Sequence, residues 1–582
     1  MQSSKKLTGA FLPAIFCTLV MMLAACGGGS GSGSTTKAAA NQQIYVRALP
    51  GFTDVKTLDP AMSSDLYSSQ AIDAVFTGLV TLNDKLEVVD QLAASHSVSA
   101  DGLTYTFKLK PNLKFSDGTA LTSADVVYSI DRALDPALKS PTSTLYLGLI
   151  KDANARANGQ VKTLIDDSLL TPDANTVVIK TSQKAAYFLD SLTLTNSYVV
   201  EKSMIQKYGN NFADHLAQGI GGDGPFKVSK YLHGKEIDFV PNSNYYGPKP
   251  QLSKFVIAFY QEEPTAYKAY TNNQLDETAV PTADLSNAKS LSPSQYHQYP
   301  LLTTSYLAMN FLTKPFDNIK IRQAFDLAIN KDEISHSVWK DVYPPTNHIV
   351  PQGMPGYDPN LTGPGGVKST SGDTTLAKQL FQQGMQEEGL TLQTMPPITL
   401  TTSSAGSADV RNVDAEIQQK WQTVLGVKVT INDIDFNKLL DETQAATNNA
   451  KGIQMWGISW IADYPDPEDW LTLQFDKGSQ QNNMNFGQNT TSDATTQQQM
   501  QTMMEQADAN FSSNRIQQYN QVEQQAVNDV AWLPLYQQSV SHVRKACVVG
   551  VPEDAEDLVP PDDWSSIYKT TDPNCASTSS YQ

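Results

Sequence analysis

Residues 92–132 read LAASHSVSADGLTYTFKLKPNLKFSDGTALTSADVVYSIDR, and every level of their pattern points to one local structure. Within this stretch, residues 104–110 alternate between polar and apolar side chains, which predicts a half-buried strand. An Asp-Gly dipeptide stands before that strand and another after it, and such pairs supply the positive φ of tight turns. Thr122 and Asp125 then form a capping-box pattern ahead of apolar residues at helical spacing. The stretch therefore predicts a strand, a turn and a helix beginning near residue 123.

Further segments accompany this stretch along residues 57–536. They are TLDPA at 57–61, GDGPF at 222–226, PNSNYY at 241–246, YLAMN at 306–310, PFD at 315–317, RQAFDLAI at 322–329, SWIADYPDP at 459–467 and WLPLY at 532–536. In identity and order they resemble the family of extracytoplasmic peptide-binding lipoproteins that feed ABC transporters. One departure is Asp223, where threonine is more usual in that family.

The resemblance implies an α/β fold of two lobes, the class II periplasmic-binding-protein-like fold, with an extra subdomain in the first lobe. A chain of 582 residues also exceeds what one hydrophobic core usually supports. Crossing strands would join the lobes, which close on a ligand between them by a hinge motion. The expected divisions are 42–295 for lobe I with the extra subdomain at about 86–190, 296–535 for lobe II, and 536–582 for a C-terminal return to lobe I.

The N-terminus carries two lysines, then an apolar run that ends in Leu-Ala-Ala ahead of Cys26. A transmembrane anchor is the alternative, but the run is short for the roughly 20 residues that span a bilayer, and Pro13 lies within it. Residues 1–25 are therefore predicted to be a lipoprotein signal peptide, with lipidation at Cys26. Residues 26–41 contain GGGSGSGS at 27–34 and are expected to form a flexible tether.

Two further cysteines, Cys547 and Cys575, stand near the end of the chain. In an exported protein this arrangement favours a disulfide over a metal pair, because no further Cys and no group of His residues would complete a zinc site. The seven histidines are scattered without the spacing of metal ligands. We expect neither a metal site nor a cofactor.

The formal net charge is −18, and the sequence contains no run of basic residues. The surface should therefore repel the phosphate backbone of a nucleic acid, and we do not expect nucleic acid as a partner. The sequence lacks HExxH, GxSxG and P-loop motifs. We therefore expect a protein that is not an enzyme. We also expect it to be a monomer. A hydrolase using paired carboxylates is the competing class, because a pair of acids has meaning only once its geometry is known.

The segment SWIADYPDP holds the main candidate binding residues. In the resembling family, the backbone at the positions of Ser459 and Ile461 pairs with an extended peptide, and the acid at the position of Asp463 receives the α-ammonium of the peptide. Backbone pairing gives affinity without sequence preference. The alternative is that Asp463 caps the loop after the strand through local N–H groups. Trp460 fits either the wall of a side-chain pocket or the core.

Tyr245, Tyr306, Asn310 and Asn485 are weaker binding candidates, since such side chains suit a pocket that tolerates varied ligands, and each has an equally good structural interpretation. No basic residue could be assigned to the carboxylate of a ligand.

The resemblance implies a substrate-binding lipoprotein of an ABC importer that captures oligopeptides in a cleft between its lobes and delivers them to permease subunits. Such a protein would be extracytoplasmic and held at the cell membrane by its N-terminal lipid. Relatives of the same fold bind nickel chelates, haem or oligosaccharides, so these ligands remain alternatives.

Overall fold

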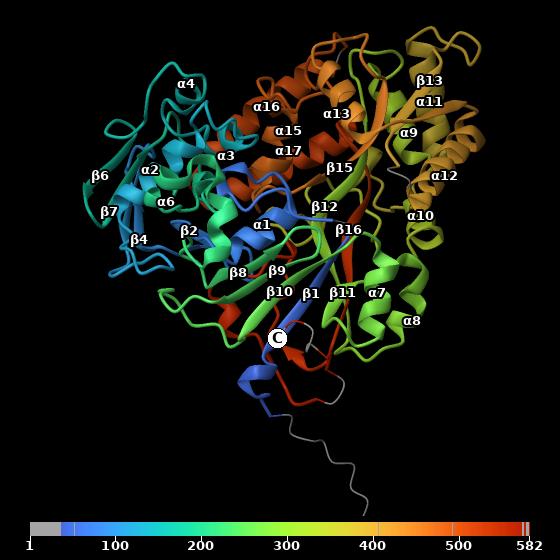
Figure 1. Cartoon of the computed structure of the whole chain (residues 1–582). Helices are drawn as coiled ribbons and strands as arrows, with labels where there is room; N and C mark the ends of the chain where they lie inside the picture. The colour runs from blue at the N-terminus through green and yellow to red at the C-terminus, as the bar shows by residue number, and fades with distance from the viewer. Residues whose placement is uncertain are drawn as a thin grey trace, which may run out of the picture. The chain divides into compact units, whose positions relative to one another are not determined.

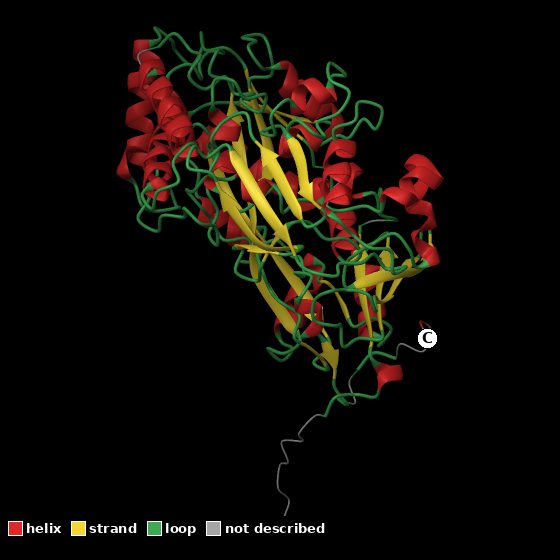
Figure 2. Cartoon of the chain, turned by 90° about the vertical axis from the view of Figure 1, so that its left-hand side faces the viewer, coloured by secondary structure: helices red, strands yellow, loops and turns green. Residues whose placement is uncertain are grey.

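A large mixed sheet runs through the computed structural model, which describes residues 36–51, 53–404, 407–491, 493–572, 575–577 and 581. Over these residues the sheet has ten strands in the spatial order β14 (Val429–Asp433), β13 (Ile398–Thr402), β15 (Met455–Ile461), β12 (Tyr296–Met309), β16 (Leu533–Arg544), β11 (Glu277–Ala279), β1 (Ile44–Pro50), β10 (Lys254–Tyr260), β9 (Glu236–Pro241) and β8 (Phe226–Leu232). Figure 2 shows these strands with helices on both sides.

Two long strands, β12 and β16, link the halves of this sheet and run side by side through its middle (Figure 1). They pair antiparallel from Tyr296 opposite Val543 to Leu307 opposite Leu533. At one end β16 pairs with β11, and at the other end β12 pairs with β15. The expected arrangement of two α/β parts joined by crossing strands is therefore confirmed.

The opening sequence stretch forms the structure that its pattern predicts. β5 (Thr104–Leu109) buries Tyr105, Phe107 and Leu109, and α2 (Ser123–Ala133) begins after a complete capping box of Thr122 and Asp125. β5 belongs to a separate four-stranded sheet in the order β4 (Ala93–Val98), β5, β7 (Thr176–Lys180) and β6 (Leu169–Asp173). This sheet and α2 share one hydrophobic core.

The remaining elements cover the two sheets or connect their strands. The helices are α1 (Leu66–Asp73), α3 (Ser143–Leu147), α4 (Ala153–Ala157), α5 (Phe188–Ser191), α6 (Lys202–Tyr208), α7 (Glu263–Thr271), α8 (Leu285–Lys289), α9 (Ile319–Leu327), α10 (Lys331–Ser337), α11 (Thr374–Glu387), α12 (Ala408–Leu425), α13 (Phe436–Ala445), α14 (Pro467–Trp470), α15 (Thr472–Phe475), α16 (Ala494–Asp508) and α17 (Arg515–Asp529). Two further sheets have two strands each: β2 (Val80–Leu82) pairs with β3 (Val88–Asp90), and β17 (Val548–Val549) pairs with β18 (Tyr568–Lys569).

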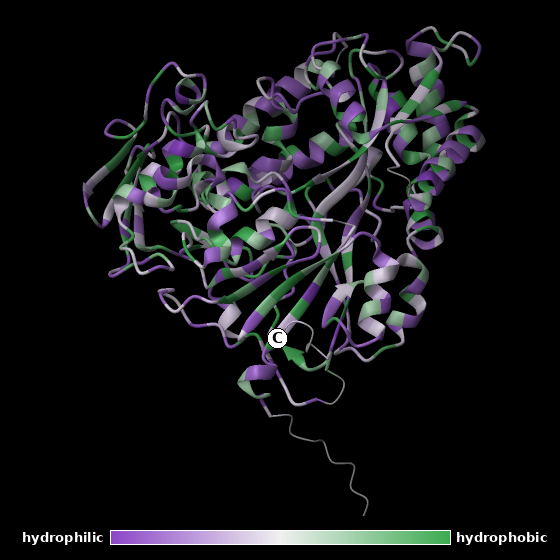
Figure 3. Cartoon of the chain, viewed as in Figure 1, coloured by the Kyte–Doolittle hydropathy of each residue, from purple (hydrophilic) through white to green (hydrophobic). Residues whose placement is uncertain are grey.

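The longer helices are amphipathic, with hydrophilic and hydrophobic residues in turn along their length (Figure 3). α12 buries Val413, Ile417, Trp421 and Leu425, which are four residues apart and lie on one face. The helix ends at Gly426, whose φ of 74° is the left-handed conformation that glycine adopts readily. On α16, Met500 and Met504 are buried and belong to a hydrophobic core.

The chain begins its folded part earlier than the sequence suggests. A flexible tether extending to residue 41 was expected. The backbone of Lys37, however, pairs with that of Thr570 in an isolated antiparallel β-bridge, and the N–H of Ala38 donates a hydrogen bond to the carbonyl of Lys569 at 2.8 Å. The last residues of the expected tether are thus hydrogen-bonded to the C-terminal segment. The predicted signal peptide and the predicted lipidation site Cys26 lie outside the described residues.

The expected domain divisions remain predictions, although the strands can be compared with them. The division after residue 295 falls at the start of β12, whereas the division after 535 falls inside β16. The four-stranded sheet lies within the range assigned to the extra subdomain.

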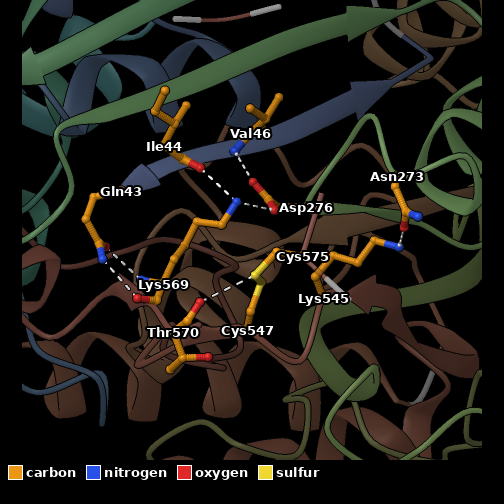
Figure 4. Close-up of a disulfide and its surroundings, with 10 residues drawn as sticks. All are labelled: Gln43, Ile44, Val46, Asn273, Asp276, Lys545, Cys547, Lys569, Thr570 and Cys575. Atoms are coloured by element: carbon orange, nitrogen blue, oxygen red, sulfur yellow. Dashed lines mark hydrogen bonds and ion pairs between the residues drawn. A yellow bond between two sulfur atoms is a disulfide. The ribbon is translucent and has the colours of Figure 1, made fainter. Parts of the chain in front are cut away.

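The C-terminal segment returns to the region of β1 and β11, where Cys547 and Cys575 form a disulfide with Cα atoms 5.6 Å apart (Figure 4). Beside it, Nζ of Lys569 lies 2.7 Å from Oδ1 of Asp276 in a buried ion pair. The side chain of Gln43 donates to the carbonyl of Lys569 at 2.9 Å. These contacts attach the tail to strand β1.

The disulfide gives a direct chemical expectation for the native protein. Neither Cys547 nor Cys575 should react with a thiol reagent until a reductant is added, because both sulfur atoms are engaged in the bond. Mass spectrometry after alkylation of the denatured, unreduced protein measures this. Alkylation of both cysteines without reductant would contradict it.

Within the described part of the chain, no helix combines the length and apolar character needed to cross a membrane. The same residues contain no group of three or more His, Cys, Asp or Glu side chains arranged to hold a metal ion.

Candidate functional site

Strand β15 has an open edge over its second half. On one side it pairs with β12 throughout, from Met455 opposite Met309 to Ile461 opposite Thr303. On the other side it pairs with β13 at Met455 and Trp456 alone, counting the described residues. Residues 457–461 therefore present unpaired backbone groups on that side, and such an edge can accept an added extended chain.

The side chains of this edge segment differ in their surroundings. Oγ of Ser459 lies 2.8 Å from Oγ of Ser305 and accepts from Nε2 of Gln538 at 3.2 Å. Ile461 is 57% exposed, which is unusual for a large apolar residue at the end of a strand. Trp460 is partly buried, and its indole N–H donates to Oδ2 of Asp469 at 3.0 Å.

Asp463 follows this edge directly, and its carboxylate is incompletely bonded. Oδ1 accepts from the hydroxyl of Tyr146 at 2.9 Å, whereas Oδ2 is buried and has no hydrogen-bond partner among the described residues. Burial raises the pKa of Asp463 to about 6, while the bond from Tyr146 lowers this pKa in part. A buried acceptor without a donor is costly, so this oxygen is available to a ligand.

The alternative role of Asp463 as a loop cap does not match these contacts. The local N–H groups are bonded by other acids: Asp466 accepts from the N–H of Glu468 at 2.9 Å, and Asp469 accepts from the N–H of Asp463 at 3.2 Å. The carboxylate of Asp463 points instead to Tyr146, which is 317 positions away in the sequence.

The Asp463 carboxylate lines a pocket of about 230 Å³, which we call the Asp463 pocket. Three separate stretches of chain form it, around α3, around α5 and around α14. The lining residues are Thr144, Leu145, Tyr146, Gly148, Leu149, Asn154, Tyr187, Ser191, Asp463, Tyr464, Glu468 and Leu473. Two of these residues, Tyr187 and Tyr464, stack their rings with centroids 6.1 Å apart. The pocket thus lies where the region of the four-stranded sheet meets the loop after β15.

Several buried acids surround the pocket and influence one another. Burial raises the pKa of Asp190 to about 8, and the charge of Asp466 adds to this effect. Burial likewise raises the pKa of Asp508 to about 7 and the pKa values of Glu468 and Asp469 well above their ordinary range. Raised pKa values mean that these acids keep their protons to a higher pH than free carboxyl groups do, so each can lose its proton when a cation is bound beside it.

One strong ion pair lies within this group. Arg515 bonds both carboxylate oxygens of Asp466, at 2.6 and 2.7 Å, in a bidentate arrangement. Among the described residues, Asp190, Asp463, Glu468, Asp469 and Asp508 have no ion-pair partner.

These pKa values give the ligand-free protein a stability that depends on pH. An acid whose pKa is higher in the folded than in the unfolded chain keeps its proton longer when folded, so stability falls as pH rises from about 4 through the folded-state pKa. For Asp463, Asp508 and Asp190 that interval ends at about 6, 7 and 8. We expect the melting temperature at pH 8 to be several degrees below that at pH 5.5.

Differential scanning calorimetry of the ligand-free protein tests this expectation. The Asp190→Asn variant should show a smaller difference between the two pH values, because one of the titrating groups is gone. A melting temperature at pH 8 that equals or exceeds the value at pH 5.5 would contradict the raised pKa values of these acids.

Four of the expected binding residues are not placed at this site. Tyr306 is 6% exposed and stacks on Trp532 in the core, with ring centroids 3.6 Å apart. Tyr245 is buried, where its hydroxyl donates to Asp562 at 2.5 Å and accepts from Gln91 at 2.9 Å. Neither residue lines the Asp463 pocket, and these contacts of both are with other parts of the protein, so a binding role for them stays a prediction.

Asn310 and Asn485 also lie outside the residues that line the Asp463 pocket. Both are fully buried, and Nδ2 of Asn485 donates to Oδ1 of Asn310 at 2.9 Å. Nδ2 of Asn310 donates to the carbonyl of Asn449 at 2.9 Å, and Oδ1 of Asn485 accepts from the N–H of Asn448 at 2.5 Å. These hydrogen bonds connect loops of the second part of the chain. The two amide groups therefore have few donors and acceptors left for a ligand.

The sequence analysis missed several residues that line the pocket or lie beside it. Glu468 and Asp469 follow Asp463 within six positions, so the density of acids in this segment was a visible signal. Tyr146, Tyr187 and Asp190 come from a distant part of the chain, and no local pattern distinguishes them from other tyrosines and acids.

Comparison with known proteins agrees with this architecture. The family model described as "Bacterial extracellular solute-binding proteins, family 5 Middle" matches residues 87–482. This match covers more than half of the chain, and the chain therefore belongs to family 5 of the bacterial extracellular solute-binding proteins.

Individual relatives are similar over most of their length. The oligopeptide-binding protein OppA of Bacillus subtilis is 26% identical over 435 residues, which cover 74% of this chain and 77% of the relative. The dipeptide-binding protein DppE of the same species is 26% identical over 496 residues, or 85% and 87% of the two chains. A dipeptide-binding protein of Lactococcus lactis is 29% identical over 464 residues, or 76% and 80%.

Solved structures show the same fold. The unliganded open form of the periplasmic murein tripeptide-binding protein MppA superposes with a TM-score of 0.73 over 93% of this chain and 99% of that chain, at 22% identity. OppA of Listeria monocytogenes bound to peptide superposes with a TM-score of 0.66 over 90% and 99%, also at 22% identity. The expected solute-binding fold is thereby confirmed.

Proposed function

We propose that this chain captures peptides with a free amino terminus and delivers them to the permease of an ABC importer. The observation that carries the proposal is the buried, unpartnered Oδ2 of Asp463 at the end of an open strand edge. The edge offers backbone hydrogen bonds to any extended peptide, and the carboxylate offers a charge-assisted bond to its α-ammonium. Several relatives are named as peptide-binding proteins, which supports this choice of ligand.

The acid and the strand edge act together in this proposal. A bound ammonium compensates the cost of burying the Asp463 carboxylate, and the carboxylate fixes the position at which the peptide begins. Backbone pairing along residues 457–461 then holds the chain without reading its side chains. Closure of the two parts about β12 and β16 would exclude water from these bonds and strengthen them.

Mass spectrometry of material that co-purifies with the unheated protein tests the nature of the ligand. Peptides that are released unchanged on denaturation, and that remain intact after prolonged incubation with the protein, would support a receptor that is not an enzyme. A nickel chelate, haem or an oligosaccharide would replace the peptide assignment, and steady cleavage of added peptides would indicate a hydrolase.

Attachment to the membrane is proposed to occur through lipid on Cys26 after removal of residues 1–25. The support is the charged and then apolar N-terminus, the small residues before Cys26 and the glycine-rich stretch after it. Several acyl chains on one cysteine would hold a protein at a membrane, whereas one short chain binds only marginally. The protein would then act as an extracytoplasmic monomer beside its permease.

The Cys26→Ala variant is expected to move from the membrane fraction to the soluble fraction, because no lipid can be attached. Immunoblotting of both fractions, with Cys547→Ala as the control that keeps the lipidation site, measures the change. A wild-type protein that is already wholly soluble would contradict the proposal.

A further inference from the structure

The Asp463 pocket combines apolar walls with a second carboxylate. Leu145, Leu149 and Leu473 supply aliphatic surface, and the tyrosine rings of the pocket supply aromatic surface. Glu468 also lines the pocket, is 5% exposed and accepts a hydrogen bond from the hydroxyl of Tyr464. Among the described lining residues there is no Lys, Arg or His.

The charges around the pocket are far from balanced. Asp190, Asp466, Asp469 and Asp508 lie close enough to affect Asp463, Glu468 or one another, while Arg515 is engaged by Asp466. One peptide α-ammonium bound to Asp463 would neutralise a single charge of this group. The remaining acids favour a ligand that carries a second positive charge near its amino terminus.

Unpartnered oxygen atoms provide an independent indication of a missing cation. Oδ2 of Asp463 is buried without a hydrogen-bond partner, and so is Oδ1 of Asp469, a residue that is completely buried beside it. Buried carboxylate oxygens are normally hydrogen-bonded, so each unpartnered one calls for an explanation, and at a pocket wall a cationic ligand that supplies the donors is one such explanation.

We propose that the Asp463 pocket receives the first residue of the peptide and selects a basic side chain, lysine or arginine, at that position. This inference rests on the proposed function, since Asp463 holds the α-ammonium. The charged end of the side chain bonds Glu468, and its aliphatic stem lies along Tyr187 and Tyr464. Long basic side chains commonly cover apolar and aromatic surface in this way while their charge meets an acid.

Calorimetry on the wild-type protein tests the inference with series of peptides three to six residues long. The first series has lysine as the first residue, followed by alanines. The second series has norleucine there, which is uncharged and similarly long. The peptide with lysine first should bind about 10- to 100-fold more tightly, as expected for one charge-assisted bond. A third series with lysine at the third position should gain no more than about threefold over its norleucine counterpart, since it carries the same charge away from the pocket.

The possible outcomes separate the two claims. Equal affinity for lysine and norleucine at the first position overturns the inference and leaves the proposed function standing. An equal gain from lysine at the third position also overturns it, because the general negative charge of the protein would then explain the preference. Failure of every free-amino peptide to bind overturns the proposed function itself.

The Glu468→Gln variant locates the preference within the pocket. The ratio of affinities for the lysine and norleucine peptides should fall to within about twofold, because a neutral amide replaces the carboxylate. Asp441→Asn removes an exposed acid on α13 and should keep the wild-type ratio. A Glu468→Gln protein that retains the wild-type ratio of lysine-peptide to norleucine-peptide affinity contradicts the proposed role of Glu468. The comparison of these peptides on the wild-type protein does not depend on whether this variant folds.

Discussion

The Asp463→Asn variant is expected to bind peptides with a free amino terminus about 2–5 kcal/mol more weakly than the wild type, a loss of about 30-fold to several thousand-fold. The amide keeps the shape of the side chain but removes its charge. A buried α-ammonium would then face a neutral group, and the hydroxyl of Tyr146 would remain bonded to the amide oxygen. Isothermal titration calorimetry with one peptide on both proteins measures the difference.

A matched control separates this effect from the general charge of the protein. Asp441→Asn also removes one negative charge from the second part of the chain, but its side chain is exposed on α13. Its affinity should stay within about twofold of the wild type, because exposed charges are screened by salt. If the two variants bound equally well, Asp463 would not contact the ligand.

Arg322→Met is expected to lower the free energy of unfolding by about 3–5 kcal/mol, as is typical when one partner of a buried ion pair is removed. The guanidinium of Arg322 is 0% exposed, and its Nη2 donates to Oδ2 of Asp493 at 2.8 Å. Its Nε and Nη1 donate to the carbonyls of Asp529 and Phe316, both at 2.9 Å. Methionine fills similar space but leaves these acceptors without donors.

Chemical denaturation followed by circular dichroism measures this change in stability. Arg411→Met is the control, because Arg411 is exposed and donates one hydrogen bond of 3.1 Å to Ser404. Its effect should be within about 0.5 kcal/mol. An Arg322→Met protein as stable as the Arg411→Met protein would show that the buried network contributes little.

Local patterns predicted local structure well in this chain. The alternation of residues 104–110 and the capping box at Thr122 depend on neighbours in sequence, and both appear in the structure as β5 and the start of α2. Asp463 was predicted to bind a ligand because it directly follows a strand in a recognisable segment. In the structure it is one of the residues that line a pocket, while its binding role stays a prediction. These signals were all short in range.

The roles of the weaker candidates depended on contacts between distant parts of the chain. Asn310 and Asn485 bond each other across 175 positions, and the aromatic partner of Tyr306 is Trp532. A tyrosine or asparagine with suitable chemistry for a ligand has equally suitable chemistry for a core, and only its three-dimensional surroundings distinguish the two. Tyr146 was missed for the same reason.

The acids at the Asp463 pocket couple the binding of a cationic ligand to the loss of protons from the protein. Asp463 and Glu468 lie in one pocket, where burial raises the cost of ionising both groups, and the charges of Asp508 and Asp466 add to this cost for Glu468. A cationic ligand removes that cost, so its binding should be accompanied by release of protons near pH 6–7, where the pKa values of Asp463 and Asp508 lie. Affinity and stability are therefore linked through the same carboxylates.

Calorimetric comparison of one peptide with its N-acetylated form tests the central claim most directly. Acetylation removes the α-ammonium and leaves the remaining backbone and side chains unchanged, so the wild-type protein should bind the acetylated peptide at least about 30-fold more weakly. In Asp463→Asn the two forms should bind with nearly equal affinity. Equal binding of the free and acetylated peptides to the wild type would contradict the role of Asp463 as the anchor of the amino terminus.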